Sequence, residues 1–305
     1  MTEKQPSTWY NAPNAVQRRY TTDCGITVYV DSAGNQYPSV PTITSRIDHW
    51  NSKERLIDPI IHEQYGEATV SDRCDVDPSH LFWFSRQVGR LAHHQIASQY
   101  RDIGSYELTL AERELTELNE SEVREDTHDD IVYSVAASRG WVTGRDDPAF
   151  EVISTDGALL RQAREDVRKI RRNWELASSE LGITQETVQA VEWMGVHPLP
   201  NEHGTQSAGF GGQIDLIYER DGKHKTVDLK TSEWFYAKYV MQALAYRHLC
   251  PLSAETQVIR LGRERGDYAV FSSTSDDWPD SQRIWSRFKA EAILVSELVN
   301  GTRWD

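Results

Sequence analysis

Apolar and polar residues alternate along residues 211–232, GGQIDLIYERDGKHKTVDLKTS, and this alternation is typical of β-strands. The dipeptide Asp221-Gly222 interrupts the alternation near its centre. Such a dipeptide between two alternating segments indicates a two-residue type I′ turn, which requires positive φ at both positions. The sequence therefore predicts a β-hairpin in which Arg220 faces Lys223.

The register of this hairpin brings three charged residues together. Counting back from the turn places Asp215 directly opposite Asp228, and Lys230 lies two residues farther along on the same face. The other face is expected to carry the aliphatic residues Ile214, Leu216, Val227 and Leu229. Two acids and a lysine are thus predicted on one side of the hairpin, with apolar residues behind them.

Apolar residues at helical spacing predict four longer helices and a short one. The longer helices are expected at about residues 79–100, 156–181, 233–249 and 281–299. Gly182 is expected to end the second of them, because glycine readily takes the left-handed conformation that follows many helix C-termini. The short helix lies within residues 42–50, with its cap near Thr42 or Thr44.

Further strands are expected on both sides of the hairpin. A buried strand that contains Glu192 precedes it, and two more follow near residues 256–262 and 267–273. Two short strands are expected within residues 25–40, and the glycine-rich stretch 201–212 is expected to be a mobile loop. Strands that alternate with helices predict a single α/β domain with a mixed sheet.

The chain is expected to divide into a core and two added segments. Residues 1–80 would form an N-terminal embellishment packed on a core of residues 81–305. Residues 101–150 are the least regular part, and the charged stretch LTLAERELTELNESEVREDTHDD predicts an exposed acidic insertion there.

The charge balance limits the partners that the protein can bind without specificity. In 305 residues, 33 Lys and Arg stand against 47 Asp and Glu, which gives a formal net charge of −14. This excess argues against broad adsorption to nucleic acid or anionic membranes but leaves room for a local basic groove. Four arginines of the helix at 156–181 share one face, namely Arg161, Arg164, Arg168 and Arg172. Phosphate binding and a solvated helix face explain them equally well.

Cysteine usage and hydropathy indicate the compartment. Cys24, Cys74 and Cys250 are odd in number and far apart, which predicts neither a disulfide framework nor a cysteine-rich metal site. The polar N-terminal stretch lacks the apolar core of a secretory signal, and no apolar run approaches the length of a membrane span. We therefore expect an intracellular, cytoplasmic protein that does not contact a membrane.

The two opposed acids point to a bound cation. Like charges directly opposite one another destabilise a hairpin, so the pairing of Asp215 with Asp228 would weaken a hairpin that had only a structural role. A divalent ion such as Mg²⁺ or Mn²⁺ removes the repulsion, since it binds one or two carboxylates together with water and phosphate. The alternative is an ordinary charged strand face exposed to solvent.

Five short sequence motifs follow one another along the chain. They are YPSVPTITSRIDHW, GRLAHH, GGQIDLI, TVDLKTS and YVMQALAYRHL, and they span about residues 37–249. In this order they resemble the PD-(D/E)xK nuclease superfamily, in particular its RecB-like branch and the phage and mitochondrial-maintenance exonucleases. The resemblance implies an α/β, restriction-endonuclease-like core, in which helices flank a central mixed β-sheet and to which N-terminal and helical embellishments are added.

The resemblance also implies a role for each matched residue. Asp215, Asp228 and Lys230 would be the catalytic residues. The implied metal ligands are His93, Asp215, Asp228, the backbone carbonyl of Leu229 and, with a less constant spacing, Glu192. The implied substrate-binding residues are Gln242, Tyr246, Thr231 and Ser39, to which the helix arginines Arg164 and Arg168 are added on charge. Ordinary packing is the alternative for His93, Gln242 and Tyr246.

These residues together predict a metal-dependent DNA nuclease that uses Mg²⁺ or Mn²⁺. The resemblance favours an exonuclease that hydrolyses phosphodiester bonds of single-stranded or end-frayed DNA in replication, recombination or repair. A structure-specific endonuclease of the same superfamily and a non-cleaving DNA-binding subunit are the alternatives. Some relatives carry an iron–sulfur cluster on four cysteines, and since this chain has only three, no cluster is expected.

Overall fold

A computed structural model describes residues 16, 18–22, 26–51, 78–100, 133, 136, 158–199, 208–232, 235, 237–250, 252–275, 278 and 280–301. Five strands form the central sheet in the order β4-β5-β6-β7-β8. Their bounds are β4 Val188–Leu199, β5 Ala208–Arg220, β6 Lys223–Lys230, β7 Ser253–Leu261 and β8 Tyr268–Ser272. Neighbouring strands pair antiparallel except β6 and β7, which pair parallel, so the sheet is mixed as predicted.

The hairpin of β5 and β6 has the predicted turn. Asp221 and Gly222 take φ values of 55° and 69°, as a type I′ turn requires. Arg220 pairs with Lys223, and the ladder continues to the pair Leu216–Val227. The register that the sequence predicts is therefore confirmed to the position just before the two acids.

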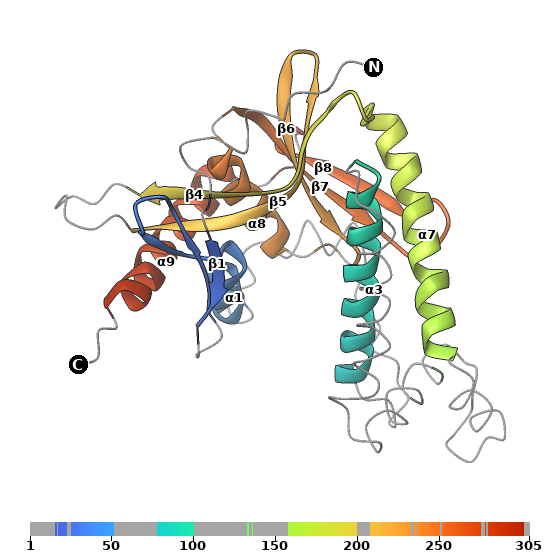
Figure 1. Ribbon diagram of the computed structural model, residues 1–305, viewed down its shortest axis with the longest axis horizontal. Helices are drawn as coiled ribbons and strands as arrows, with labels where there is room; N and C mark the ends of the chain where they lie inside the picture. Colours follow the sequence, from blue (N-terminus) through green and yellow to red (C-terminus); the bar gives the residue numbers. More distant parts are fainter. Residues whose placement is uncertain are drawn as a thin grey trace.

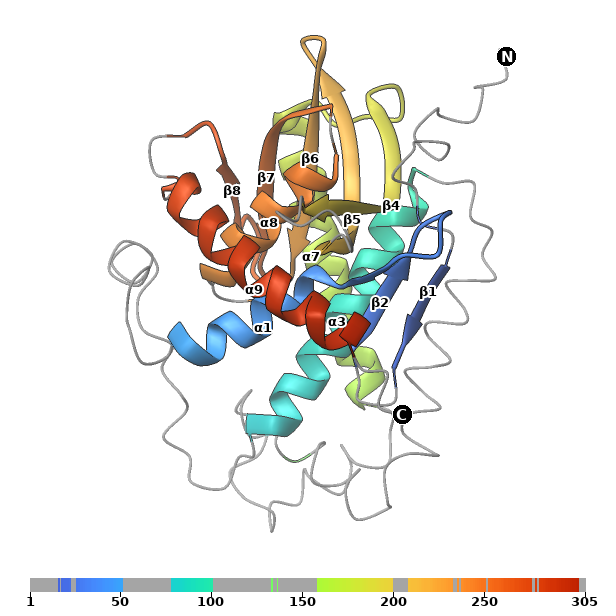
Figure 2. The same ribbon diagram turned by 90° about the vertical axis from the view of Figure 1, so that its left-hand side faces the viewer.

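Helices cover both faces of the sheet (Figures 1 and 2). Helices α3 (Pro78–Ser98) and α7 (Ala158–Leu181) lie side by side on one face and share a buried core with Leu216, Val227 and Leu229. The other face is covered by α1 (Val40–Asn51), α8 (Ala237–Leu249) and α9 (Ser281–Gly301). Helix α8 also provides the crossover that the parallel pair β6 and β7 requires.

The end of α7 agrees with the prediction, and the start of α1 does not. Gly182 ends α7 at a φ of 67°, as predicted. Helix α1 begins at Val40, before the expected cap at Thr42 or Thr44, and this prediction was wrong. The cap is Ser39, whose Oγ accepts the backbone N–H of Thr42 at 3.2 Å.

A small antiparallel sheet precedes the core. It contains β1 (Arg18–Thr21), β2 (Thr27–Val30) and β3 (Gln36–Pro38), one strand more than the sequence predicted. It packs against the first residues of β5, which were expected to be loop. A Cβ at Gly209 would lie 2.7 Å from Cδ1 of Tyr37, and one at Gly211 would lie 2.6 Å from Cβ of Tyr29. These glycines are strand residues that permit close approach of two tyrosines.

Two expectations fall mostly outside the described residues. Of the proposed insertion at 101–150, only Tyr133 and Ala136 are described, and both are buried. Cys24 and Cys74 are not described, whereas Cys250 is buried. Among the helices that are described, none combines the length and the apolar character that a membrane span requires.

Candidate active site

The predicted acids lie where β5 and β6 separate. Their ladder ends at the pair Leu216–Val227, so Asp215 and Asp228 are the next residues on each strand. β4 pairs with β5 on both sides of this point, at Val191–Leu216 and Trp193–Ile214. The position between them on β4 is Glu192, which has a positive φ of 47°.

This irregularity corrects one prediction. Ile214 was expected on the same face as Leu216, but it packs in the core beneath α8 and α9, whereas Leu216 packs beneath α3 and α7. The alternation of β5 therefore breaks at Asp215, beside the positive φ of Glu192. Such a break re-aims a side chain, and here it directs the Asp215 carboxylate toward β6.

Asp215 is fixed by the neighbouring strand. Its Oδ2 accepts the backbone N–H of Leu229 at 2.7 Å. The same oxygen lies 4.0 Å from Nδ1 of His93 on α3. Asp215 is thus hydrogen-bonded to the backbone of the residue that lies between Asp228 and Lys230.

Asp228 is almost fully buried, with 3% of its surface exposed. Its Oδ1 accepts a hydrogen bond from Nζ of Lys230 at 2.8 Å. Its Oδ2 is buried without a hydrogen-bond partner in the part of the chain that the structure describes. A buried carboxylate oxygen of this kind is costly unless a cation or proton binds it.

The pKa values of the two acids also show that the site disfavours their charged forms. Burial raises the pKa of Asp215 and of Asp228 from 3.8 to about 6 each, although the Lys230 ammonium lowers both. The charge of Asp215 raises the pKa of Asp228 further. Two neighbouring carboxylates in a low-dielectric site resist ionising together, and a divalent cation would relieve this.

The donor atoms suit a hard cation. Asp228 is buried and has an unpartnered oxygen, and the half-buried Asp215 lies beside it, so the pair offers the carboxylate oxygens that Mg²⁺ and Mn²⁺ prefer. Within the described ranges, no three His, Cys, Asp or Glu side chains are grouped so as to hold an ion together. The carboxylate pair is therefore the part of the predicted ligand set that the fold assembles, while His93 and Glu192 stand beside it.

His93 lies one helical turn after Gly89 on α3. A Cβ at Gly89 would lie 2.5 Å from Oγ1 of Thr231, so only glycine allows α3 to approach the end of β6 this closely. Burial lowers the pKa of His93 to about 4, assisted by the charge of Lys230, so the imidazole is neutral at neutral pH. A hydrogen bond with the Leu229 backbone opposes this shift.

Glu192 shares a small cavity with these groups. The cavity has a volume of about 10 Å³, and its lining includes His93, Glu192, Asp215 and Leu229. This volume accommodates one water-sized particle. The charge of Glu192 raises the pKa values of both His93 and Asp215, as expected for an acid close to them.

Gln242 and Tyr246 lie on the buried face of α8. Gln242 donates a hydrogen bond from Nε2 to Oγ1 of Thr44 at 3.3 Å, so it holds α1 against α8. Tyr246 lies close enough to the acids that the charges of Asp228 and Asp215, after burial, raise its pKa well above the usual range. The structure thus brings Tyr246 to the acid pair, while the described contact of Gln242 is to α1.

The remaining predicted substrate contacts differ in position. Thr231 follows Lys230 and is half-buried beneath Gly89. Ser39 is buried and serves as the cap of α1. Arg164 and Arg168 lie on the exposed face of α7. Their roles in binding stay predictions.

Sequence reasoning missed one neighbour of the lysine. Nζ of Lys230 lies 4.9 Å from the ring centroid of Tyr239, a distance typical of a cation–π contact. The Tyr239 hydroxyl donates a hydrogen bond to Oγ of Ser232 at 3.1 Å. The position of Tyr239 in the first turn of the helix after the lysine was the available signal.

Known proteins provide an independent comparison. Helices on both faces of a mixed sheet confirm the predicted α/β, restriction-endonuclease-like fold. SSO0001, known from a crystal structure, is similar at 17% identity with a TM-score of 0.30, over 48% of this chain and 65% of that protein, less than two thirds of its length. None of the curated proteins compared with the chain matches it. A family model for the PD-(D/E)XK nuclease superfamily matches residues 73–266, well over half of the chain, which therefore belongs to that superfamily.

Proposed function

We propose that the protein is a Mg²⁺- or Mn²⁺-dependent deoxyribonuclease of the RecB-like branch that acts as an exonuclease on single-stranded or frayed DNA ends. Membership of a nuclease superfamily supports phosphodiester hydrolysis in general. The observation that carries the proposal is the buried Oδ2 of Asp228, which lacks a partner among the described residues, beside Asp215 and Lys230. The PSV element of YPSVPTITSRIDHW and the GRLAHH motif favour the exonuclease branch.

Each residue of the site has a defined task in this reaction. Asp215 and Asp228 hold the charge that attracts the ion, and the Leu229 carbonyl lies between the second acid and the lysine. A bound divalent ion would supply Lewis-acid activation of the phosphate and of water. Lys230 directs its ammonium into the site, where it orients the attacking water or stabilises charge that develops on the phosphate. His93, neutral at neutral pH, can accept or ligate without adding positive charge.

The first experiment compares two lysines of the same strand. Lys230→Gln is expected to lower the rate of DNA hydrolysis with Mn²⁺ by about a hundredfold or more, as for loss of a preorganised charge at a reaction centre. Lys223→Gln is the matched control, because Lys223 lies at the exposed turn end of β6. Equal rates for the two variants would contradict the proposed role of Lys230.

Substrate topology separates the remaining alternatives. The wild-type protein is incubated with end-labelled single-stranded, duplex and circular DNA, with Mn²⁺, with Mg²⁺ and with EDTA. An exonuclease degrades linear DNA and spares circles. Circular DNA cleaved as fast as linear DNA would overturn the exonuclease proposal and favour an endonuclease. DNA binding without any cleavage would favour a non-cleaving subunit.

A further inference from the structure

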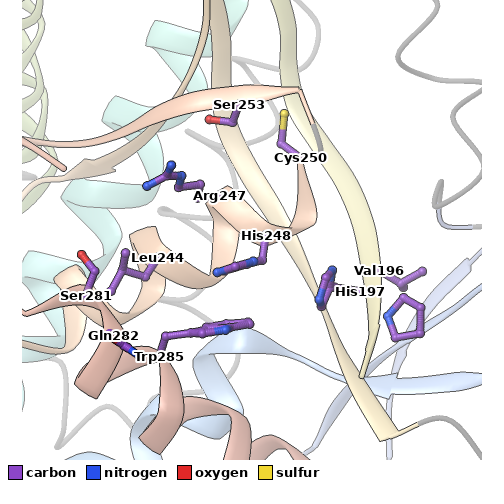
Figure 3. Close-up of a pocket in the computed structure, with 11 residues that line it drawn as sticks. Val196, His197, Leu244, Arg247, His248, Cys250, Ser253, Ser281, Gln282 and Trp285 are labelled. Atoms are coloured by element: carbon purple, nitrogen blue, oxygen red, sulfur yellow. The ribbon is translucent and has the colours of Figure 1, made fainter. Parts of the chain in front are cut away.

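A second cavity lies at the opposite end of α8 from Lys230 and Tyr239. It has a volume of about 790 Å³, within the range of small-molecule sites. It lies between the end of β4, the last turn of α8 and the first turns of α9, and Figure 3 shows the side chains that line it. Those used below are His197, Arg247, His248 and Trp285.

The cavity is separate from the acid pair. His197 pairs with Phe210 across β4 and β5, and Phe210 precedes Asp215 by five residues. Five residues of extended strand span roughly 17 Å. None of the residues that line the cavity belongs to the acid and lysine group, so it is a distinct site.

An aromatic platform forms one wall. The rings of His248 and Trp285 stack with centroids 3.6 Å apart and an interplanar angle of 12°. Phe288 supports Trp285 in turn, at 5.7 Å and 13°, and His197 lies 5.6 Å from His248. Burial lowers the pKa of His248 to about 4, so its ring is neutral at neutral pH and offers a π-face for a planar ligand.

Positive charge accompanies this platform. Arg247 lines the cavity and is exposed, and its guanidinium makes no hydrogen bond or ion pair with any residue that the structure describes. Lys289 lies 5.9 Å from the Trp285 ring centroid, and its charge also acts on His248. The described lining includes no carboxylate. In a chain with a net charge of −14, two cations without an ion-pair partner among the described residues, beside an aromatic wall, indicate an anionic aromatic ligand.

Two simpler explanations do not fit. A metal site at His197, His248 and Cys250 would need three grouped ligands, and the described residues form no such group. An anion at the start of α9 would need free backbone N–H groups. Asp280 already accepts those of Gln282 and Arg283 through Oδ1, at 3.0 and 3.2 Å.

We propose that this cavity binds a nucleotide, with the base against the His248–Trp285 stack and the phosphate on Arg247. The ligand is either a free nucleotide or one nucleotide of a single strand, since both present the same base and phosphate. Guanidinium groups bind phosphate through paired, charge-assisted hydrogen bonds, and aromatic rings stack on any base. The site needs no cleavage activity and stands independently of the proposed nuclease function.

Calorimetric titration of the full chain with dAMP in EDTA tests the site without hydrolysis. Arg247→Gln is expected to weaken dAMP binding about tenfold, as for loss of one charge-assisted hydrogen bond. Arg283→Gln is the matched control, because Arg283 is exposed on the same end of α9 but does not line the cavity. Deoxyadenosine is expected to bind more weakly than dAMP. Asp228→Asn is expected to bind dAMP as the wild type does.

The same variants are then titrated with fluorescein-labelled oligo(dA). Parallel weakening by Arg247→Gln identifies a single strand as the occupant, and weakening for dAMP alone identifies the free nucleotide. Equal dAMP affinity of Arg247→Gln and wild type would overturn the proposal. So would loss of dAMP binding in Asp228→Asn with retention in Arg247→Gln, which would place the nucleotide at the acid pair. Neither result would affect the Lys230→Gln test of the nuclease.

Discussion

Lys230 is held from two sides, by the Asp228 carboxylate at 2.8 Å and by the Tyr239 ring at 4.9 Å. A cation–π contact that is partly desolvated is worth about 1 kcal/mol, so its loss would let the ammonium sample other positions. Tyr239→Leu is expected to lower kcat about fivefold while KM changes little, because about 1.4 kcal/mol corresponds to one decade in rate and about 1 kcal/mol is lost here. Steady-state kinetics on a labelled single strand measure both constants.

Tyr239→Phe separates positioning from packing. Phenylalanine keeps the ring beneath Lys230 and removes only the hydrogen bond to Ser232. It is expected to retain a rate close to that of the wild type. If Phe and Leu lower kcat equally, or if both raise KM instead, Tyr239 does not act through the lysine ammonium.

The acid pair gives the metal-free protein a distinct pH dependence. The pKa of Asp215 is 3.8 in its unperturbed state and about 6 in the fold, so between these values the folded state binds more protons than the unfolded state. The free energy of unfolding therefore falls as pH rises from about 4 to 6. Asp215→Asn removes this loss and is expected to be more stable than the wild type above pH 6, by at most about 3 kcal/mol for two pKa units.

Urea denaturation in EDTA measures this difference at pH 4 and pH 7.5. The wild type and Asp215→Asn are expected to come close together at the lower pH, where the acid is protonated in the folded state and about half protonated in the unfolded state. The amide can still accept the N–H of Leu229, so the hydrogen bond at 2.7 Å is retained. Unfolding free energies that differ by the same amount at both pH values would show that the Asp215 charge does not oppose folding.

At the scale of elements, the contact between α3 and the end of β6 sets the position of His93. A Cβ at Gly89 would lie 2.5 Å from Oγ1 of Thr231, which is closer than real Cβ contacts allow. Gly89→Ala is expected to destabilise the protein by about 1–3 kcal/mol through overpacking, despite the better helix propensity of alanine. The added change Thr231→Ala removes Oγ1 and is expected to restore most of that stability. Thermal unfolding of the single and double variants provides the test, and a fully stable Gly89→Ala would contradict the contact.

Elements with local signals were predicted well, whereas those set by tertiary contacts were not. The Asp221-Gly222 turn fixes its own register, and Gly182 marks the end of α7, because both act through backbone conformation alone. The positive φ of Glu192 has no such signal, since glutamate is not a residue that favours it. The reversed face of Ile214 beside it was therefore missed.

The same distinction applies to the site and to the strand before it. Residues Ala208–Gly212 were expected to be loop because they are rich in glycine, but close packing against Tyr29 and Tyr37 makes them strand. The hairpin register alone predicted that Asp215, Asp228 and Lys230 lie close together, although it did not predict the break of alternation at Asp215. Tyr246 was named from the motif resemblance, whereas Tyr239 reaches Lys230 through the docking of α8, which its position after the lysine signals only in part.

At the scale of the whole molecule, an acidic chain must still attract a polyanion. Helix α7 lies at the outer edge of the fold (Figure 1). It packs on the core through residues such as Val167, Ile170 and Trp174. Its exposed arginines are Arg161, Arg164, Arg168 and Arg172. Whether this face binds phosphate or is merely solvated is decided by the salt dependence of DNA binding. The binding constant K falls as salt rises, and each phosphate contact on a single strand makes the plot of log K against log salt concentration steeper by about 0.7.

Arg168→Gln combined with Arg172→Gln is therefore expected to reduce that slope by about 1.4 and to weaken binding most at low salt, because two cations no longer displace counterions from the strand. Fluorescence anisotropy of a labelled single strand in EDTA, repeated over a salt series, measures the slope without cleavage. Lys223→Gln combined with Arg283→Gln removes two exposed cations elsewhere and matches the change in net charge. If both double variants lower the slope equally, the effect comes from net charge alone, and the arginine face of α7 is only a solvated helix surface.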